Sequence, residues 1–86
     1  MRYMYRQIGE YIGRAADGSF LVLTDDDTIP LPELLFLFWD EFERAADAGA
    51  IREDIIRSYR INDELFNDMA DTLQSVGLLE LVKVEV

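Results

Sequence analysis

The sequence contains no cysteine and no histidine among its 86 residues. Without cysteine there can be no disulfide bond and no thiolate nucleophile, and without histidine there is no imidazole for acid–base catalysis. The two absences together exclude zinc sites with Cys or His ligands. Little conventional active-site chemistry is left. We therefore expect a protein that is not an enzyme and has no catalytic residues, no metal site and no cofactor.

Long hydrophobic runs are also missing. No apolar stretch approaches the ~20 residues that a membrane-spanning helix needs, and Glu33, Asp40 and Glu41 interrupt the longest one. The first residues, Met-Arg-Tyr-Met-Tyr-Arg, lack the apolar core of a signal peptide. We expect a cytoplasmic protein without a membrane partner, built as one small domain over residues 1–86 with a single modest core.

Positive charge is scarce. Eight basic residues stand against 18 acidic ones, which gives a formal net charge of −10, and lysine occurs once, at Lys83. Because proteins gain affinity for DNA by neutralising phosphates with Lys and Arg, we expect no nucleic-acid partner. Two interpretations of the acidity stay open. It can serve solubility or a salt-rich host, or it can imitate nucleic acid and attract a basic partner.

The first third of the chain is typical of an antiparallel sheet. Aromatic and β-branched residues predict strands over residues 3–8, 11–14, 19–23 and 28–31. Gly9 marks a bulge or break, and Asp17-Gly18 tolerates the positive φ of a two-residue hairpin turn. The run Phe-Leu-Val-Leu at 20–23 indicates a strand inside the sheet, buried on both faces. The three aspartates at 25–27 could bind a hard cation, but a turn needs no metal to be polar.

Three helices and a last strand follow. The predicted helices cover residues 32–48, 51–59 and 62–76, and the predicted strand covers residues 79–86. Pro32 suits the first turn of the first helix, which Gly49 is expected to stop. Asn62 caps the third helix, and Gly77 ends it with a Schellman closure through Leu78. We expect no second strand after the last one to complete a hairpin wing.

The first helix carries more apolar surface than one buried stripe can use. At about 100° per residue, one broad face collects Leu34, Leu35, Phe38, Trp39, Phe42, Ala45 and Ala46. Phe36 and Leu37 point away from that face, among Asp40, Glu43 and Arg44. These two side chains need a cover, either a sheet, a second copy of the chain or a bound peptide. The N-terminal sheet is the plainest cover, and we expect a monomer or a weak homodimer.

The third helix has an apolar stripe and an acidic side. The stripe is expected to place Leu65, Met69, Leu73 and Val76 inward, with Phe66 and Ala70 at one edge. The exposed side carries Glu64, Asn67, Asp68, Asp71 and Gln74, where a DNA-reading helix would carry Arg and Lys. The charged pairs Asp40/Arg44 and Asp68/Asp71 have the spacing of ordinary solvent-facing pairs, so they do not indicate an active site.

The order of elements predicts an α+β fold, a winged helix-turn-helix with an N-terminal three-stranded antiparallel sheet and three helices. The segment from Asp17 to Leu23, a polar turn, and Leu31-x-Glu33 running into Phe38-Trp39 resemble the PqqD-like family, whose third strand leads through a Leu-Asn-Glu turn into a helix with a tryptophan. Tyr59, the acidic start of the third helix, Asp68 and Gly77-Leu78-Leu79 resemble its closing segment. The resemblance covers roughly residues 10–81. Pro32 replaces the family's Asn, which a helix start tolerates, and the third helix is a residue or two shorter.

The resemblance implies a peptide-binding module, the recognition element of ribosomally made, modified peptides. Such a domain binds the leader of a precursor peptide and presents the precursor to a modifying enzyme. In that family the leader adds a strand beside the third strand and packs on the third helix. The peptide-binding residues implied here are Thr28, Ile29, Pro30, Leu31, Phe66, Met69, Ala70 and Leu73.

The direction of Pro30 decides how well this edge can accept a strand. If Pro30 faces the neighbouring strand, the open edge keeps the N–H donors of Ile29 and Leu31. If Pro30 faces outward, it blunts the edge against pairing. The alternative function is an acidic interaction or inhibitor module, of phage or plasmid type, that occupies a nucleic-acid-binding site on a partner protein.

Overall fold

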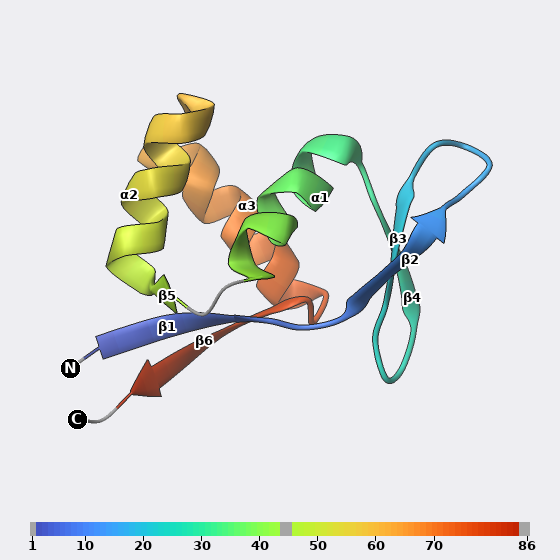
Figure 1. Cartoon of the computed structure of the whole chain (residues 1–86), viewed down its shortest axis with the longest axis horizontal. Coiled ribbons are helices and arrows are strands. Elements are labelled where there is room, and N and C mark those ends of the chain that lie inside the picture. The colour runs from blue at the N-terminus through green and yellow to red at the C-terminus, as the bar shows by residue number, and fades with distance from the viewer. Residues whose placement is uncertain (1, 44–45, 85–86) are drawn as a thin grey trace.

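The computed structural model describes residues 2–43 and 46–84. Its elements are β1 (Arg2–Gln7), β2 (Glu10–Arg14), β3 (Phe20–Leu23), β4 (Thr28–Leu31), α1 (Glu33–Asp40), the 3-10 helix η1 (Glu41–Glu43), β5 (Ala46–Asp47), α2 (Ala48–Tyr59), α3 (Asp63–Ser75) and β6 (Leu79–Val84). The fold is therefore α+β, and it combines three-stranded antiparallel sheet with three α-helices, as predicted (Figure 1). None of the helices in the described ranges is long and apolar enough to cross a membrane.

The strands form two sheets, with the orders β2-β3-β4 and β5-β1-β6. The first contains the strands expected over residues 11–14, 19–23 and 28–31, and β3 lies at its centre as predicted, whereas the strand expected over residues 3–8 is β1 and lies in the second sheet. In the second, β1 pairs antiparallel with β6 over its whole length, from Arg2 opposite Val84 to Gln7 opposite Leu79. The last strand therefore finds its partner at the other end of the chain, and the two strands run side by side below α2 and α3 in Figure 1.

Gly9 separates β1 from β2, as predicted, and it does so for a steric reason. Its φ is +102°, and a Cβ atom built on it would lie 2.7 Å from Cγ1 of Val22. Any other residue would be strained in φ and would press on the buried Val22 side chain. The chain can therefore pass from one sheet to the other at this position only with glycine.

Trp39 ties the β5-β1-β6 sheet to α1. Its buried indole N–H donates to the carbonyl oxygens of Ile8 at 3.2 Å and Leu78 at 3.1 Å. The side-chain amide of Gln7 donates in turn to the carbonyl oxygen of Trp39 at 2.9 Å. The end of β1 and the start of β6 are thus fixed against the same turn of α1.

The first helix is shorter than predicted. The α-helix ends at Asp40, η1 continues to Glu43, and β5 then pairs with β1. The carboxylate of Asp47 accepts the N–H of Ala50 at 3.2 Å and caps α2, so Gly49 lies inside α2 and does not stop α1. The predicted range 32–48 was wrong because the strong capping preference of Asp47 starts a new helix there. Residues 44–45, including the predicted partner of Asp40, lie outside the described part of the chain.

The hydrophobic core draws on both sheets and all three helices. Its buried residues are Val22, Leu31, Phe38, Trp39, Phe42, Ile51, Ile55, Phe66, Met69, Ala70, Leu73, Leu78 and Leu79. At its centre the Phe38 ring meets the rings of Phe42 and Phe66 edge to face, with both centroid distances at 5.2 Å. Three aromatic rings from two helical segments and η1 therefore hold the helices together.

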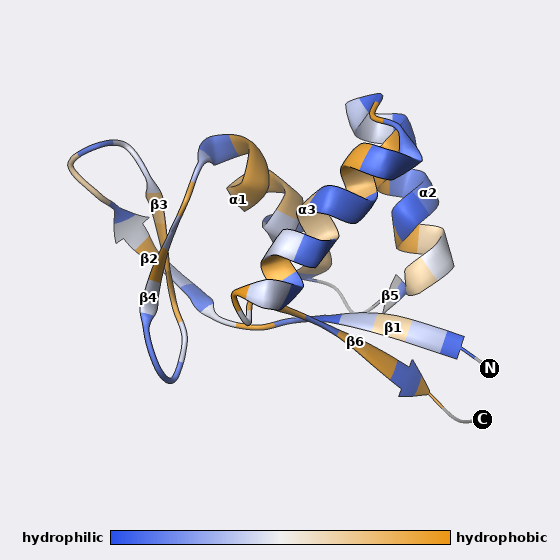
Figure 2. Ribbon diagram, turned by 180° about the vertical axis from the view of Figure 1, so that it is seen from behind, coloured by the Kyte–Doolittle hydropathy of each residue, from blue (hydrophilic) through white to orange (hydrophobic). Residues whose placement is uncertain are grey.

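The surplus apolar surface of α1 is covered only in part. The Phe36 ring stacks on Phe20 of β3, with centroids 4.4 Å apart and planes 11° apart, so the N-terminal sheet covers it. Leu37 stays 40% exposed, and Leu34, which was expected on the buried face, is 52% exposed. Figure 2 shows α1 as the most uniformly hydrophobic of the helices. Part of its apolar surface is therefore left facing solvent.

The apolar stripe of α3 is rotated from the predicted one. Phe66 and Ala70 lie at its centre and are buried, whereas Leu65 and Val76 are exposed. Both helix ends are as predicted. The side chain of Asn62 accepts the N–H of Leu65 at 2.8 Å, and a Schellman closure through Gly77 joins the N–H of Leu78 to the carbonyl of Leu73 at 2.9 Å.

Two expectations for the β2–β4 sheet were wrong. The hairpin loop between β2 and β3 has three residues, because Ala15 donates to Ser19 at 2.8 Å and Gly18 donates back to Ala15 at 3.0 Å. This is a type I turn followed by a residue with positive φ, the usual three-residue solution. The strand β3 is also not buried on both faces, since Leu23 is exposed. No helix covers the outer side of this sheet in Figure 1.

Candidate functional site

The first part of the predicted peptide site is the edge strand β4. The N–H of Thr24 donates to the carbonyl of Asp27 at 2.8 Å, so these two residues form a hydrogen-bonded pair. This pair fixes which residues of β3 and β4 exchange backbone hydrogen bonds. Because the direction of these bonds alternates along the strand, the backbone N–H and carbonyl groups of Ile29 and Leu31 point toward β3. The backbone groups of Thr28 and Pro30 point toward the open edge. Pro30 therefore faces outward.

An outward Pro30 leaves the open edge of β4 without a free donor. Proline has no N–H, and the N–H of Thr28 already donates to the carboxylate of Asp27 at 2.8 Å. The edge keeps the carbonyl oxygens of Thr28 and Pro30 as acceptors. A strand that pairs in the usual way must both donate and accept, so β4 offers only half of that pattern.

The second part of the predicted site lies in the core. The residues Phe66, Met69, Ala70 and Leu73 of α3 are all buried, and so is Leu31 of β4. Phe66 touches Tyr5 and Phe38 and has the guanidinium of Arg52 over its ring at 4.7 Å. Of the eight residues, only Thr28 and Pro30 are exposed, and Ile29 is half-buried. The structure thus does not bring the eight together on one accessible surface.

An accessible apolar groove lies next to these residues, between the start of α1 and one flank of α3. Its volume is about 270 Å³, and its lining residues are Pro32, Leu34, Leu35, Leu65, Asp68, Met69 and Thr72. We call it the α1–α3 groove. Of the residues predicted from the sequence it includes Met69 alone, although Pro32 directly follows the predicted Leu31.

Local sequence features build both walls of the α1–α3 groove. Pro32 has an extended backbone, with φ −65° and ψ 156°, so it ends β4 and starts α1 in one step. This places the first turn of α1, with Leu34, beside the end of the sheet. On the other wall, the lining residues of α3 recur at i, i+3, i+4 and i+7, which puts them on one helix face.

The groove has an apolar lining and an acidic rim. Asp68 is exposed at the rim, and Glu33 and Glu64 precede two lining leucines in the chain and are exposed. Neither α1 nor α3 contains a Lys or Arg residue. The groove can therefore hold an apolar group whose neighbours are neutral or positively charged.

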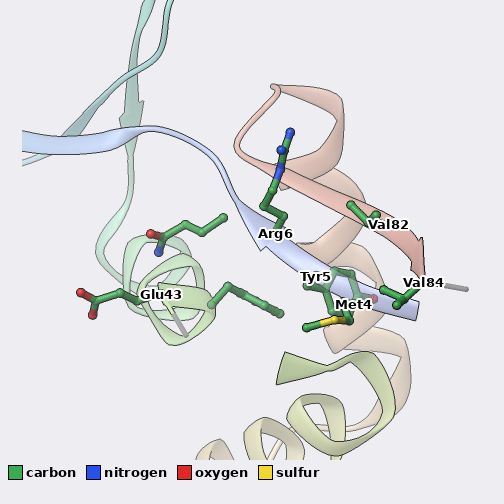
Figure 3. Close-up of a pocket in the computed structure, with 8 residues that line it drawn as sticks. Met4, Tyr5, Arg6, Glu43, Val82 and Val84 are labelled. Carbon is green, nitrogen blue, oxygen red and sulfur yellow. The ribbon is translucent and has the colours of Figure 1, made fainter. Parts of the chain in front are cut away.

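A second hollow, of about 300 Å³, lies where β1 and β6 meet η1 (Figure 3). Its lining is largely apolar and consists of Met4, Tyr5, Arg6, Gln7, Phe42, Glu43, Val82 and Val84. Burial raises the pKa of the Tyr5 phenol, and the charge of Asp71 adds to this effect while Arg52 opposes it. A phenol held in its neutral form is a packed aromatic group, not an acid or base that would act near neutral pH.

The other perturbed groups also have structural explanations. Burial raises the pKa of Tyr59 to about 12, helped by its hydrogen bond to the Glu41 carboxylate at 2.8 Å and by the charges of Glu41 and Asp40. The N–H and hydroxyl of Ser19 lower the pKa of Asp17 in the hairpin loop. Over residues 2–43 and 46–84, no group of three or more carboxylates could hold a metal ion.

Of the five residues predicted on the exposed side of α3, four are exposed and Gln74 is half-buried. Glu64, Asp68 and Asp71 face solvent. The side-chain oxygen of Asn67 accepts a hydrogen bond from Arg52 of α2 at 2.7 Å. Arg52 also donates to the carboxylate of Asp63 at 3.1 Å. This side of the helix is negatively charged and has the wrong sign for a nucleic-acid phosphate.

Comparison with known proteins identifies no relative. No family model matches the chain, no curated protein matches its sequence, and no solved structure matches its fold. The α1–α3 groove, its acidic rim and the open sheet edges are therefore the features from which a function can be inferred.

Proposed function

We propose that this chain is a peptide-binding module in the role that its resemblance to the PqqD-like family implies. It holds the leader segment of a ribosomally synthesised precursor peptide and presents that precursor to a modifying enzyme. The observation that carries the proposal is the apolar α1–α3 groove with exposed leucines on both walls. In this role the chain is a cytoplasmic accessory protein with no catalytic residue and no cofactor of its own.

The leader is bound mainly through its side chains. The α1–α3 groove approaches the lower end of ligand pockets, ~300 Å³, and has room for one or two apolar side chains. Beside it, the outward carbonyls of Thr28 and Pro30 can accept N–H groups from an extended peptide, although β4 cannot donate in return. Basic residues next to the apolar anchors would be attracted by Asp68 and by the acidic chain as a whole.

We further propose that the helices and the β5-β1-β6 sheet form a winged helix-turn-helix. Two features support this: β5 lies between α1 and α2, and β6 directly follows α3. Arg60, with a left-handed φ of 53°, makes the tight turn between α2 and α3. The strand β1 takes the place of a second wing strand, because it pairs with β6.

The proposal is tested with peptides selected on the protein itself. A phage-displayed library of random peptides supplies the strongest binder, and calorimetry then compares its affinity for three proteins: the parent, Leu65→Asp and Leu37→Asp. The two leucines are matched, at 39% and 40% exposed, but only Leu65 lines the groove. We expect Leu65→Asp to weaken binding at least about tenfold, which is ~1.4 kcal/mol, and Leu37→Asp to change it little.

Equal binding by the parent and Leu65→Asp, with both folded by circular dichroism, would remove the groove from the proposal. The acidic module remains the second candidate, and the exposed Glu64, Asp68 and Asp71 favour it. For that candidate the double change Glu64→Gln and Asp71→Asn should abolish binding of a basic partner while Leu65→Asp leaves it unchanged. Leu65→Asp and the double variant Glu64→Gln/Asp71→Asn therefore distinguish the peptide-binding module from the acidic module.

A further inference from the structure

The strand β6 has an open edge that differs from that of β4. The N–H of Ile8 donates to the carbonyl of Leu78 at 3.0 Å, which fixes the alternation of the β1–β6 pair. The backbone groups of Leu79, Leu81 and Lys83 therefore point away from β1. Leu79 is only 3% exposed, whereas Leu81 and Lys83 are both exposed. The accessible edge thus offers two N–H donors and two carbonyl acceptors.

This edge has none of the protection that proline gives to β4. The strand runs for six residues, Leu-Glu-Leu-Val-Lys-Val. In the part of the chain that the structure describes, no strand pairs with its outer side. An edge with free donors and acceptors can pair with another strand unless something blocks it.

The charge of the β5-β1-β6 sheet indicates which partner the edge can accept. The sheet contains the basic Arg2, Arg6 and Lys83 and the acidic Asp47 and Glu80, so its three positive and two negative charges give +1, on a chain of −10. Arg6 pairs with Glu80, and Arg2 lies 3.8 Å from Asp47. Two copies of the chain can therefore meet at this sheet with little local repulsion, whereas their acidic remainders repel each other.

We propose that β6 pairs antiparallel with β6 of a second copy about a two-fold axis at Val82. In this register Leu81 lies opposite Lys83 of the second copy, and the same contact recurs in the other direction. All four accessible backbone groups of each copy are then paired, and two three-stranded sheets become one of six strands. Such a self-complementary contact is the rule for two-fold dimers.

The side chains fit this register. Val82 meets Val82 of the second copy on the axis, at the closely spaced type of antiparallel position. Its neighbour on the same face is Met4, which lies opposite it in β1, and both are half-buried. On the other face, Leu81 of each copy packs against the apolar stem of Lys83 of the other.

The test uses Lys83, whose side chain is exposed and whose N–H makes no bond within its own sheet. In Lys83→Pro the edge donor is lost and the ring blocks pairing, but the fold of the single chain loses no hydrogen bond. Lys83→Ala removes the same charge and keeps the N–H, so it is the matched control. Sedimentation velocity over a concentration series should show the parent and Lys83→Ala moving from 10.0 kDa toward twice that mass.

We expect Lys83→Pro to raise the dissociation constant of the dimer at least about tenfold relative to Lys83→Ala, because the bond donated by residue 83 is lost in both copies and the ring hinders the close approach of the strands. Raising the salt concentration should strengthen the dimer of the parent, since screening reduces the long-range repulsion. If Lys83→Pro fails to fold, Val82→Lys replaces it, with Val82→Thr as control. A chain that stays monomeric at every concentration and salt, or a dimer that neither Lys83→Pro nor Val82→Lys weakens, would overturn the proposal.

Discussion

Truncation of Phe66 to alanine separates a core residue from a peptide anchor. The side chain is completely buried, and its ring lies 5.2 Å from that of Phe38 and 6.3 Å from that of Tyr5, measured between centroids. Removing a buried phenylalanine ring costs ~3–5 kcal/mol. A domain of this size has a free energy of unfolding of about 4–13 kcal/mol. Phe66→Ala should therefore remove a large share of the stability, even with no peptide present.

Urea unfolding followed by tryptophan fluorescence gives the free energy of unfolding, since Trp39 lies in the core. The matched control is Leu65→Ala, one residue away on α3 but 39% exposed, which should cost less than about 1 kcal/mol. If Phe66→Ala is too unstable to measure, Phe66→Leu provides a milder truncation at the same position. A Phe66→Ala protein that unfolds within about 1 kcal/mol of the parent would refute the burial of this ring.

Two further predictions concern Trp39 and Tyr59. Trp39→Phe keeps the aromatic packing but removes the N–H shared by the carbonyls of Ile8 and Leu78, so it should lower the free energy of unfolding by about 1–2 kcal/mol. A loss below about 0.5 kcal/mol, measured by circular dichroism in urea because the variant has no tryptophan, would contradict the link between α1 and the β5-β1-β6 sheet. The pKa of Tyr59 is raised to about 12, above the ordinary 10.0, so the fold favours the protonated phenol. Its contribution to stability is complete below the ordinary pKa and is lost as the pH rises through about 12. Ultraviolet titration of the folded protein should show an ionisation near pH 12 that is missing in Tyr59→Phe, and a Tyr59 step at the ordinary pKa would contradict it.

Features decided by neighbouring residues could be predicted from the sequence. Asn62 caps α3, Gly77 closes it, and Gly9 interrupts the first strands, and each acts through its own backbone or its next few residues. The end of α1 could not be predicted as well, because the cap that starts α2 at Asp47 competes with a helical pattern that continues through it. The pairing of β1 with β6 was missed because it joins the two ends of the chain.

The candidate site was harder to predict for the same reason. Phe66 and Leu65 are adjacent, and periodicity alone placed Leu65 inward. Phe66 is buried because Tyr5, Phe38 and Arg52 surround it, and these contacts come from three other elements. The groove itself was not predicted, because Leu34 and Leu35, which form its α1 wall, were expected on the buried face of the helix.

The central claim is that an extended peptide binds in the α1–α3 groove, and a map of amide chemical shifts tests it most directly. Isotope-labelled protein is titrated with the strongest peptide selected on the parent, while Leu65→Asp serves as the control that should not respond. The account predicts shifts at Leu34 and Leu35 on one wall and at Leu65, Met69 and Thr72 on the other. Shifts confined to Asn67 and Asp71 on the opposite flank of α3, with none at the groove, would contradict it.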